Sequence, residues 1–130
     1  MHDRQEQSGA FNAELEGRRI LVVEDSPVVA EACGEMLRDM GCEVVGPATN
    51  MAFALQMAEA EEIDAAVVDI NIRGGKAFPV LRILHKRNIP FLLTSGYADW
   101  SMPEEWQEQP RLAKPYTPNL LRESLLKLLA

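Results

Sequence analysis

The sequence contains few cysteines, and those present form no pattern typical of a disulfide framework or a metal site. Its two cysteines, Cys33 and Cys42, belong to no CxxC motif and to no cluster of cysteine and histidine. This spacing argues against a structural zinc site and against a small disulfide scaffold. Two buried, reduced thiols are the simpler interpretation, and they are typical of a cytoplasmic protein.

Long apolar runs and basic runs are also missing. No segment approaches the 18 apolar residues of a membrane-spanning helix, and the first residues contain no apolar stretch of a secretory signal. The formal net charge is −7. An acidic chain without a basic run is a poor candidate for binding nucleic acid or an anionic membrane, but it can attract a divalent cation or a basic partner.

The remaining composition is that of one globular domain. The chain has 130 residues, of which 47% are hydrophobic and 25% are charged. Residues 1–17 are polar and show no periodicity, so we expect a flexible N-terminal tail there. Residues 18–130 are then the folded domain.

Short apolar runs alternate with amphipathic segments along this domain. The runs lack polar alternation, as in strands buried on both faces, and lie near residues 20–23, 42–46, 65–69, 90–93 and 111–113. Helices are expected between them and at the C-terminal end. Five strand-helix units in alternation predict an α/β fold with a doubly wound parallel sheet. We expect a turn at residues 47–50 and a flexible loop at residues 70–75, where two glycines permit unusual backbone conformations.

The fourth helical segment is weak. Residues 97–110 contain Trp100 and Trp106 together with Pro103, and they can form at most a short helix, at about residues 103–108. Two large aromatic side chains in such a segment indicate either a clamp onto the sheet or a surface for a partner.

Polar residues follow the apolar runs at the points where four strands end. They are Glu24–Asp25 after the first strand, Asp69 at the end of the third, Thr94–Ser95 after the fourth and Lys114 after the fifth. Asp69 alone could be a ligand-binding carboxylate or only a cap of the following loop. Because the carboxyl ends of parallel strands share one edge of the sheet, we expect all these residues to meet there.

Their chemistry suits phosphoryl transfer. Three carboxylates in one place repel each other, and Mg²⁺ is a cation that prefers oxygen ligands. A lysine and a hydroxyl beside the cation could hold phosphoryl oxygens. Asp69 would then be a nucleophile able to form an aspartyl phosphate.

This set of residues resembles that of the response-regulator receiver family, which has a CheY-like, flavodoxin-type fold. The resemblance covers residues 18–130 and rests on Glu24–Asp25, Asp69 with Asn71, Thr94–Ser95 and Lys114–Pro115. It implies the strand order 2-1-3-4-5. It also implies that Asp69 is the phosphoacceptor and that the peptide bond before Pro115 is cis.

The resemblance further implies the ligands of the metal and of the phosphoryl group. Mg²⁺ would be held by Glu24, Asp25, Asp69 and the backbone carbonyl of Asn71. The phosphoryl oxygens would be bound by Lys114 and by the hydroxyl residues Thr94 and Ser95.

Two features depart from the family pattern. Arg111 occupies the place where most receivers carry an aromatic switch residue on the last strand, and Tyr97 is the candidate substitute. A subclass of single-domain receivers also lacks that aromatic residue. The weak fourth helix is the second departure, and we expect residues 97–110 to order or shift on phosphorylation.

The expected function is that of a stand-alone receiver, not an enzyme, that takes a phosphoryl group from a phosphohistidine onto Asp69. The donor would be a sensor histidine kinase or a histidine phosphotransfer protein, and the domain would signal through a partner or serve as a phosphate shuttle or sink, as a monomer or weak dimer. Two alternatives remain. One is a receiver fold that binds proteins without phosphorylation. The other is a small Mg²⁺-dependent aspartyl-phosphate phosphohydrolase. Such an enzyme needs a second acid two residues after the nucleophile as its acid/base, and the chain has Asn71 there.

Overall fold

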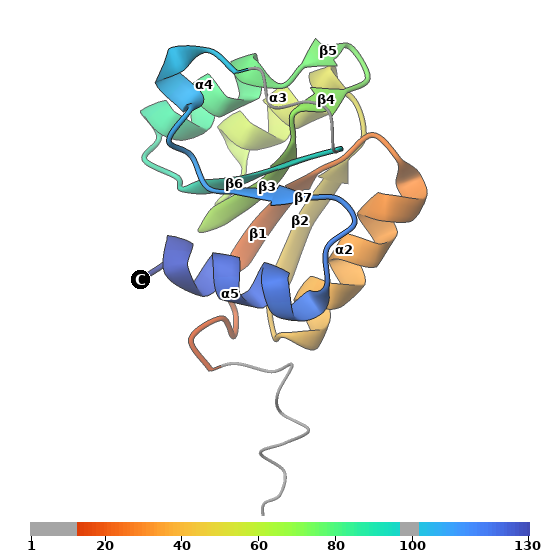
Figure 1. The fold of residues 1–130 in the computed structure, drawn as a ribbon, viewed down its shortest axis with the longest axis vertical. Coiled ribbons are helices and arrows are strands. Elements are labelled where there is room, and N and C mark those ends of the chain that lie inside the picture. The colour runs from red at the N-terminus through yellow and green to blue at the C-terminus, as the bar shows by residue number, and fades with distance from the viewer. Residues whose placement is uncertain (1–12, 97–101) are drawn as a thin grey trace, which may run out of the picture.

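A parallel sheet forms the centre of the computed structural model, which describes residues 13–96 and 102–130. Its five strands lie in the order β2-β1-β3-β6-β7, and each neighbouring pair is parallel (Figure 1). The strands are β1 (Arg19–Val23), β2 (Glu43–Ala48), β3 (Ala65–Asp69), β6 (Phe91–Ser95) and β7 (Arg111–Ala113). Numbered within the sheet, this is the order 2-1-3-4-5, so the predicted fold class is confirmed.

Four helices cover the two faces of the sheet. One face carries α2 (Pro27–Asp39) and α5 (Pro118–Leu128), and the other carries α3 (Met51–Ala60) and α4 (Phe78–Lys86) (Figure 1). Ser26, Asn50 and Thr117 precede three of these helices and accept a hydrogen bond from the backbone N–H three residues on. Such N-caps stabilise a helix by about 1 kcal/mol each and fix where it begins.

The core is divided by the sheet into two apolar clusters, as the alternation of side chains along a strand requires. In β3, Ala65 and Val67 pack in the cluster under α2 and α5, whereas Ala66 and Val68 pack in the cluster under α3 and α4. All five residues of β3 are buried. The run without polar alternation therefore corresponds to a central strand buried on both faces.

Strand β2 differs from the prediction because it continues to Ala48, through the residues expected to form a turn. The Gly46–Pro47 bond is cis, and the pairing register with β1 shifts between Leu21 and Val23. Proline is tolerated here because β2 is an edge strand, so its missing N–H interrupts no second ladder.

The expected flexible loop at residues 70–75 is wrong in part, because the chain forms a small antiparallel hairpin there. Its strands are β4 (Asn71–Ile72) and β5 (Gly75–Lys76). Gly74 has φ 110°, and a Cβ added there would lie 2.8 Å from the Cβ of Met51, so this position requires glycine. The Met51 N–H donates to the Arg73 carbonyl at 2.9 Å, which fastens the hairpin to the start of α3.

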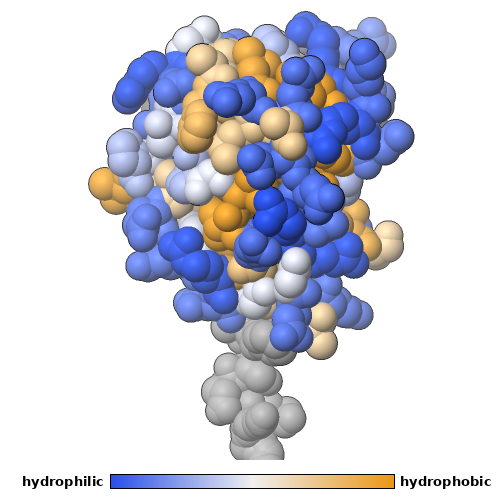
Figure 2. Space-filling model, turned by 180° about the vertical axis from the view of Figure 1, so that it is seen from behind, coloured by the Kyte–Doolittle hydropathy of each residue, from blue (hydrophilic) through white to orange (hydrophobic). Residues whose placement is uncertain are grey.

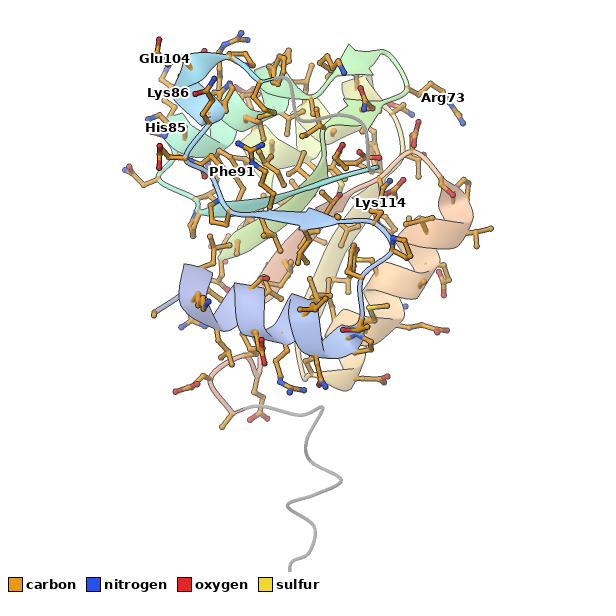
Figure 3. The ribbon with its side chains drawn as sticks, in the orientation of Figure 1. Arg73, His85, Lys86, Phe91, Glu104 and Lys114 are labelled. Atoms are coloured by element: carbon orange, nitrogen blue, oxygen red, sulfur yellow. The ribbon has the colours of Figure 1, made fainter. Side chains whose placement is uncertain are left out.

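The short fourth helix is confirmed as one 3₁₀ turn, η1 (Glu104–Trp106). Trp106 is only 3% exposed, and its ring meets His85 and Phe91 edge to face, with centroids 5.9 and 5.7 Å away. Figure 3 places His85 and Phe91 at the amino end of β6, far from Lys114. Trp106 therefore clamps η1 onto the sheet and α4, while Trp100 lies outside the described residues.

The described part of the expected tail, residues 13–17, forms turns that pack against the domain. Leu15 is fully buried with the α2 and α5 cluster, and the Gly17 N–H donates to the Gly41 carbonyl at 2.8 Å. Packing against the sheet therefore begins before residue 18.

The surface seen from behind is mostly hydrophilic, with apolar patches of limited size between charged side chains (Figure 2). Within residues 13–96 and 102–130, no helix combines the length and the apolar character needed to cross a membrane.

Candidate phosphoacceptor site

Asp69 and Thr94 lie on the same face of the sheet, at the carboxyl ends of neighbouring strands. The two residues are partners in the register of β3 and β6. Each lies two residues after a residue that packs under α2 and α5, Val67 in β3 and Leu92 in β6, so both point to that face. Ser95 has the opposite parity, and its hydroxyl donates to the Gly96 carbonyl at 3.1 Å. Of the two hydroxyl residues expected at the site, the register therefore places Thr94 on the Asp69 face and Ser95 on the other.

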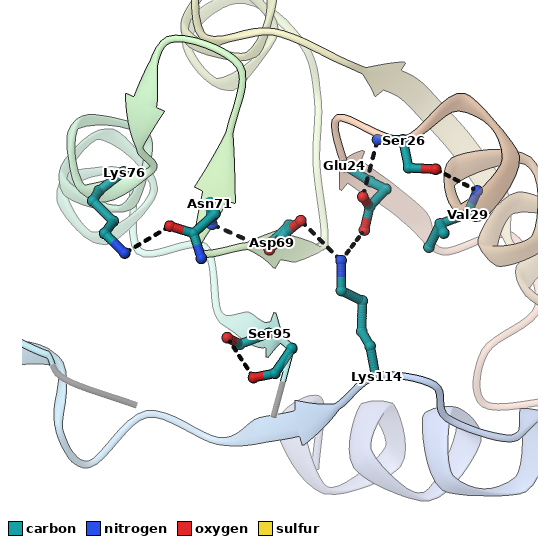
Figure 4. Close-up of polar contacts among 9 residues, drawn as sticks. Glu24, Ser26, Val29, Asp69, Asn71, Lys76, Ser95 and Lys114 are labelled. Atoms are coloured by element: carbon teal, nitrogen blue, oxygen red, sulfur yellow. Dashed lines mark hydrogen bonds and ion pairs between the residues drawn. The ribbon is translucent and has the colours of Figure 1, made fainter. Parts of the chain in front are cut away.

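Lys114 connects two of the strand ends. Its ammonium donates to Asp69 Oδ2 and to Glu24 Oε1, both at 3.0 Å (Figure 4). Glu24 and Asp69 are only 4% and 3% exposed. Because buried carboxylates are costly to leave unpaired, this shared lysine compensates much of their charge. Residues far apart in the sequence are thus joined in one buried ionic cluster.

The protonation equilibria reflect this burial. Burial raises the pKa of Glu24 above its ordinary value, although the Ser26 N–H and Lys114 oppose the shift. Burial alone would lower the pKa of the Lys114 ammonium, but the hydrogen bonds to Asp69 and Glu24 outweigh it, and the pKa is raised. Lys114 is therefore protonated at neutral pH. The raised pKa of Glu24 indicates that the pocket favours additional positive charge.

Asp25 completes a set of three carboxylates that could hold a metal ion. One oxygen each from Glu24, Asp25 and Asp69 lies within 4.8 Å of the other two. The Ser26 N–H donates to Glu24 Oε2 at 3.1 Å, so the turn into α2 fixes the orientation of that side chain. Lys114 balances only one of the three charges. The excess of two negative charges on clustered oxygens fits a divalent cation such as Mg²⁺.

The hairpin brings Lys76, which the sequence pattern did not indicate, close to the site through Asn71. The Asn71 N–H donates to Asp69 Oδ1 at 3.1 Å, so both oxygens of Asp69 are held (Figure 4). Lys76 Nζ donates to Asn71 Oδ1 at 2.6 Å from the paired position of the hairpin. A two-residue strand gives no periodic signal, which is why the sequence did not point to Lys76.

The structure describes two of the remaining expected residues, Pro115 and Arg111. The Lys114–Pro115 peptide bond is cis. The Arg111 guanidinium donates to the Gln107 carbonyl at 2.7 Å, so it is tied to the η1 segment. Tyr97, the candidate switch residue, lies outside the described residues.

An apolar groove of about 410 Å³ runs beside the pocket. Residues 28–36 of α2 form one wall, and residues 114–116 form the other. Val28, on the first turn of α2, lines this groove and is 79% exposed. Because Lys114 lies in one wall, the groove leads to the carboxylate cluster.

Fold and site together define a receiver domain, and a comparison with protein families agrees. The model of the response regulator receiver domain matches residues 20–125, which is most of the chain. The chain therefore belongs to the response regulator receiver family, whose members are phosphoacceptor modules of two-component signalling.

Individual relatives support the same assignment. The solution structure of SdrG from Sphingomonas melonis Fr1 is 36% identical with a TM-score of 0.78, over 88% of this chain and 98% of that one. A BeF3-activated conformation of SdrG from Pseudomonas melonis Fr1 is 37% identical with a TM-score of 0.73, over 86% of this chain and 96% of that one. The transcriptional regulatory protein PdtaR of Mycobacterium tuberculosis is 27% identical over 104 residues, which are 77% of this chain. The match spans about half of the length of PdtaR, 51%.

Proposed function

We propose that this protein accepts a phosphoryl group from a phosphohistidine onto Asp69. An oxygen of Asp69 attacks the phosphorus atom, the bond between phosphorus and the imidazole nitrogen breaks, and the freed imidazole takes up a proton. The observation that carries the proposal is the pocket itself. It has a nearly buried carboxylate, a lysine 3.0 Å away and two further acids within 4.8 Å.

The other side chains have complementary roles in this proposal. Lys114 exchanges its hydrogen bond with Asp69 Oδ2 for one with a phosphoryl oxygen, and the Thr94 hydroxyl donates to another. Ser95 is the weaker of the two hydroxyl candidates, because its parity on β6 turns it to the opposite face. Thr94 lies beside Asp69 in the register of the sheet, and Lys114 directly follows the last strand, so both donors come from the edge that carries Asp69.

Mg²⁺ is the proposed cofactor, held by Glu24, Asp25 and Asp69 together with the backbone carbonyl of Asn71. Bound there, it would neutralise negative charge on the phosphoryl oxygens during transfer. The excess of two carboxylates over the Lys114 ammonium is the structural support for this assignment.

The proposed donor is a sensor histidine kinase or a histidine phosphotransfer protein. The apolar groove between α2 and residues 114–116 suits an apolar helix of such a donor, because it would bring a histidine on that helix to the Asp69 pocket. In the same proposal, the phosphorylated domain either signals through a partner protein or serves as a phosphate shuttle or sink. It acts as a monomer or a weak dimer. The buried thiols Cys33 and Cys42 are unpaired, which fits the cytoplasm.

Intact mass spectrometry after incubation with acetyl phosphate tests the proposal. We expect a gain of one phosphoryl group that requires Mg²⁺ and is absent from Asp69→Asn. Glu35→Gln is the matched control, since it removes an exposed acid of α2 outside the pocket. Mg²⁺-independent uptake, or uptake by Asp69→Asn, would contradict the proposal. A failure to take up phosphoryl groups from either acetyl phosphate or a phosphohistidine protein would favour a receiver that binds partners without phosphorylation.

A further inference from the structure

Basic side chains gather on one helix of an otherwise acidic protein. Residues 70–98 contain five of the 13 lysines and arginines of the chain and none of its 20 acidic residues. Three of the five, Arg82, Lys86 and Arg87, lie in α4 or directly after it, and all three are exposed. Positive charge is therefore concentrated on α4, although the formal net charge of the chain is −7.

Arg82 and Lys86 repel each other on this helix. They are four residues apart, so their side chains are neighbours on one face, and two like charges in this arrangement destabilise a helix. Within residues 13–96 and 102–130, neither forms an ion pair with an acidic side chain. The helix dipole favours Lys86, which lies in the last turn, but not Arg82, which lies one turn earlier. The folded domain therefore leaves the charge of this pair uncompensated.

The pair borders a groove between α3 and α4. The groove has a volume of about 480 Å³ and is lined by Glu59, Arg82, Ile83, Lys86 and Arg87. The Arg87 guanidinium donates to the Ala58 carbonyl of α3, which joins the two walls. The half-buried Ile83, together with the aliphatic stems of Arg82 and Lys86, offers apolar contact between the charged groups. The groove thus combines apolar surface with two cations on one side.

We propose that this groove binds an acidic amphipathic helix of a partner protein. The carboxylates of that helix would meet Arg82 and Lys86, and its apolar side chains would pack on Ile83. Such a helix suits the groove better than nucleic acid does, because Glu59 on the α3 wall would repel a phosphate backbone, whereas a helix can carry its acids on one side only.

The proposed surface is separate from the phosphoacceptor site. Figure 3 places Lys86 far from Lys114, so a partner on α4 leaves the Asp69 pocket open. The inference therefore does not depend on the proposed phosphoryl transfer, and Asp69→Asn should bind the same helix as tightly as the wild type.

Fluorescence anisotropy with a labelled amphipathic helical peptide of leucine and glutamate tests the inference. We expect saturable binding that weakens as salt screens the charges. The double variant Arg82→Glu/Lys86→Glu should weaken binding by about tenfold or more. The matched control is Arg38→Glu/Lys127→Glu, which makes the same change in net charge in the last turns of α2 and α5 and should bind like the wild type. Arg82→Gln/Lys86→Gln, a milder change that is safer for folding, should weaken binding to a smaller extent.

Several results would overturn the inference. They are absent binding by the wild type, unchanged binding by both α4 variants, equal losses in the α4 variants and the control, and equal binding of a peptide with glutamine in place of glutamate. Tighter binding of a DNA duplex than of the acidic peptide would assign the surface to nucleic acid instead. Loss of binding in Asp69→Asn would contradict the separation of the two sites.

Discussion

Removal of Asp25 from the acidic pocket should stabilise the protein when no metal is present. The three carboxylates lie within 4.8 Å of one another, where two unit charges repel by about 3.5 kcal/mol at an effective dielectric constant of about 20. Asp25 is half-buried, and Lys114 and solvent offset part of its repulsion with Glu24 and Asp69. We therefore expect Asp25→Asn to raise the free energy of unfolding by about 1–2 kcal/mol in EDTA.

Mg²⁺ should reduce or cancel this advantage in stability. A ligand that binds only the folded state stabilises it by about 1.4 kcal/mol when its free concentration is ten times Kd. The wild type should gain this stability, whereas Asp25→Asn, which lacks one of the three oxygens, should gain little. The difference between the two proteins should therefore shrink or vanish in Mg²⁺.

Urea unfolding at pH 7, with EDTA or with Mg²⁺, measures both effects. Glu35→Gln is the control for a general reduction of negative charge, since Glu35 is exposed on α2, and it should leave the response to Mg²⁺ unchanged. Two results would contradict this prediction: Asp25→Asn is no more stable than the wild type in EDTA, or Mg²⁺ stabilises both proteins to the same extent.

Further predictions concern packing, pH, docking and the response to phosphorylation. Trp106→Ala should cost about 3–5 kcal/mol in urea unfolding, while Trp106→Phe should cost far less, because the buried indole N–H has no partner among the described residues. The raised pKa of Lys114 means that its contribution to stability is complete below pH 10.5 and is lost as pH rises through the folded-state value; a pH series of unfolding should show this loss, and Lys114→Met should not. Val28→Asp should slow transfer from a phosphohistidine protein by about tenfold but leave transfer from acetyl phosphate unchanged; equal slowing of both would exclude a docking role. Beryllofluoride should alter amide exchange at residues 104–111, and unchanged exchange there would contradict a switch in this segment.

The fold could be predicted from the sequence because its signals are local and repeated. The unbroken apolar run of β3 indicated a strand buried on both faces. Ser26–Pro27 and Thr117–Pro118 each combine a capping side chain with a first-turn proline, which is a local pattern of a helix start, and a helix begins at each. The approximate boundaries of the five main strands followed from the same runs. The edge position of β2, which lets it pass through Pro47, depends on strand order and has no local signal.

The candidate site was predictable in its composition but not in its contacts. Parallel strands bring their carboxyl ends to one edge, so the meeting of Glu24, Asp69 and Lys114 followed from the expected topology. Which of Thr94 and Ser95 shares the face of the sheet with Asp69 could be decided only from the register of β6 with β3. The contact between Lys76 and Asn71 required a hairpin of two-residue strands, which is too short for a periodic pattern.

The most direct test of the central claim is to locate the phosphoryl group by chemical trapping. Borohydride reduces an aspartyl phosphate to homoserine, and peptide sequencing by mass spectrometry then identifies the modified position. After incubation with acetyl phosphate and Mg²⁺, the account predicts homoserine at position 69 and at no other aspartate. Homoserine at Asp25 or at another position, with residue 69 unmodified, would contradict it.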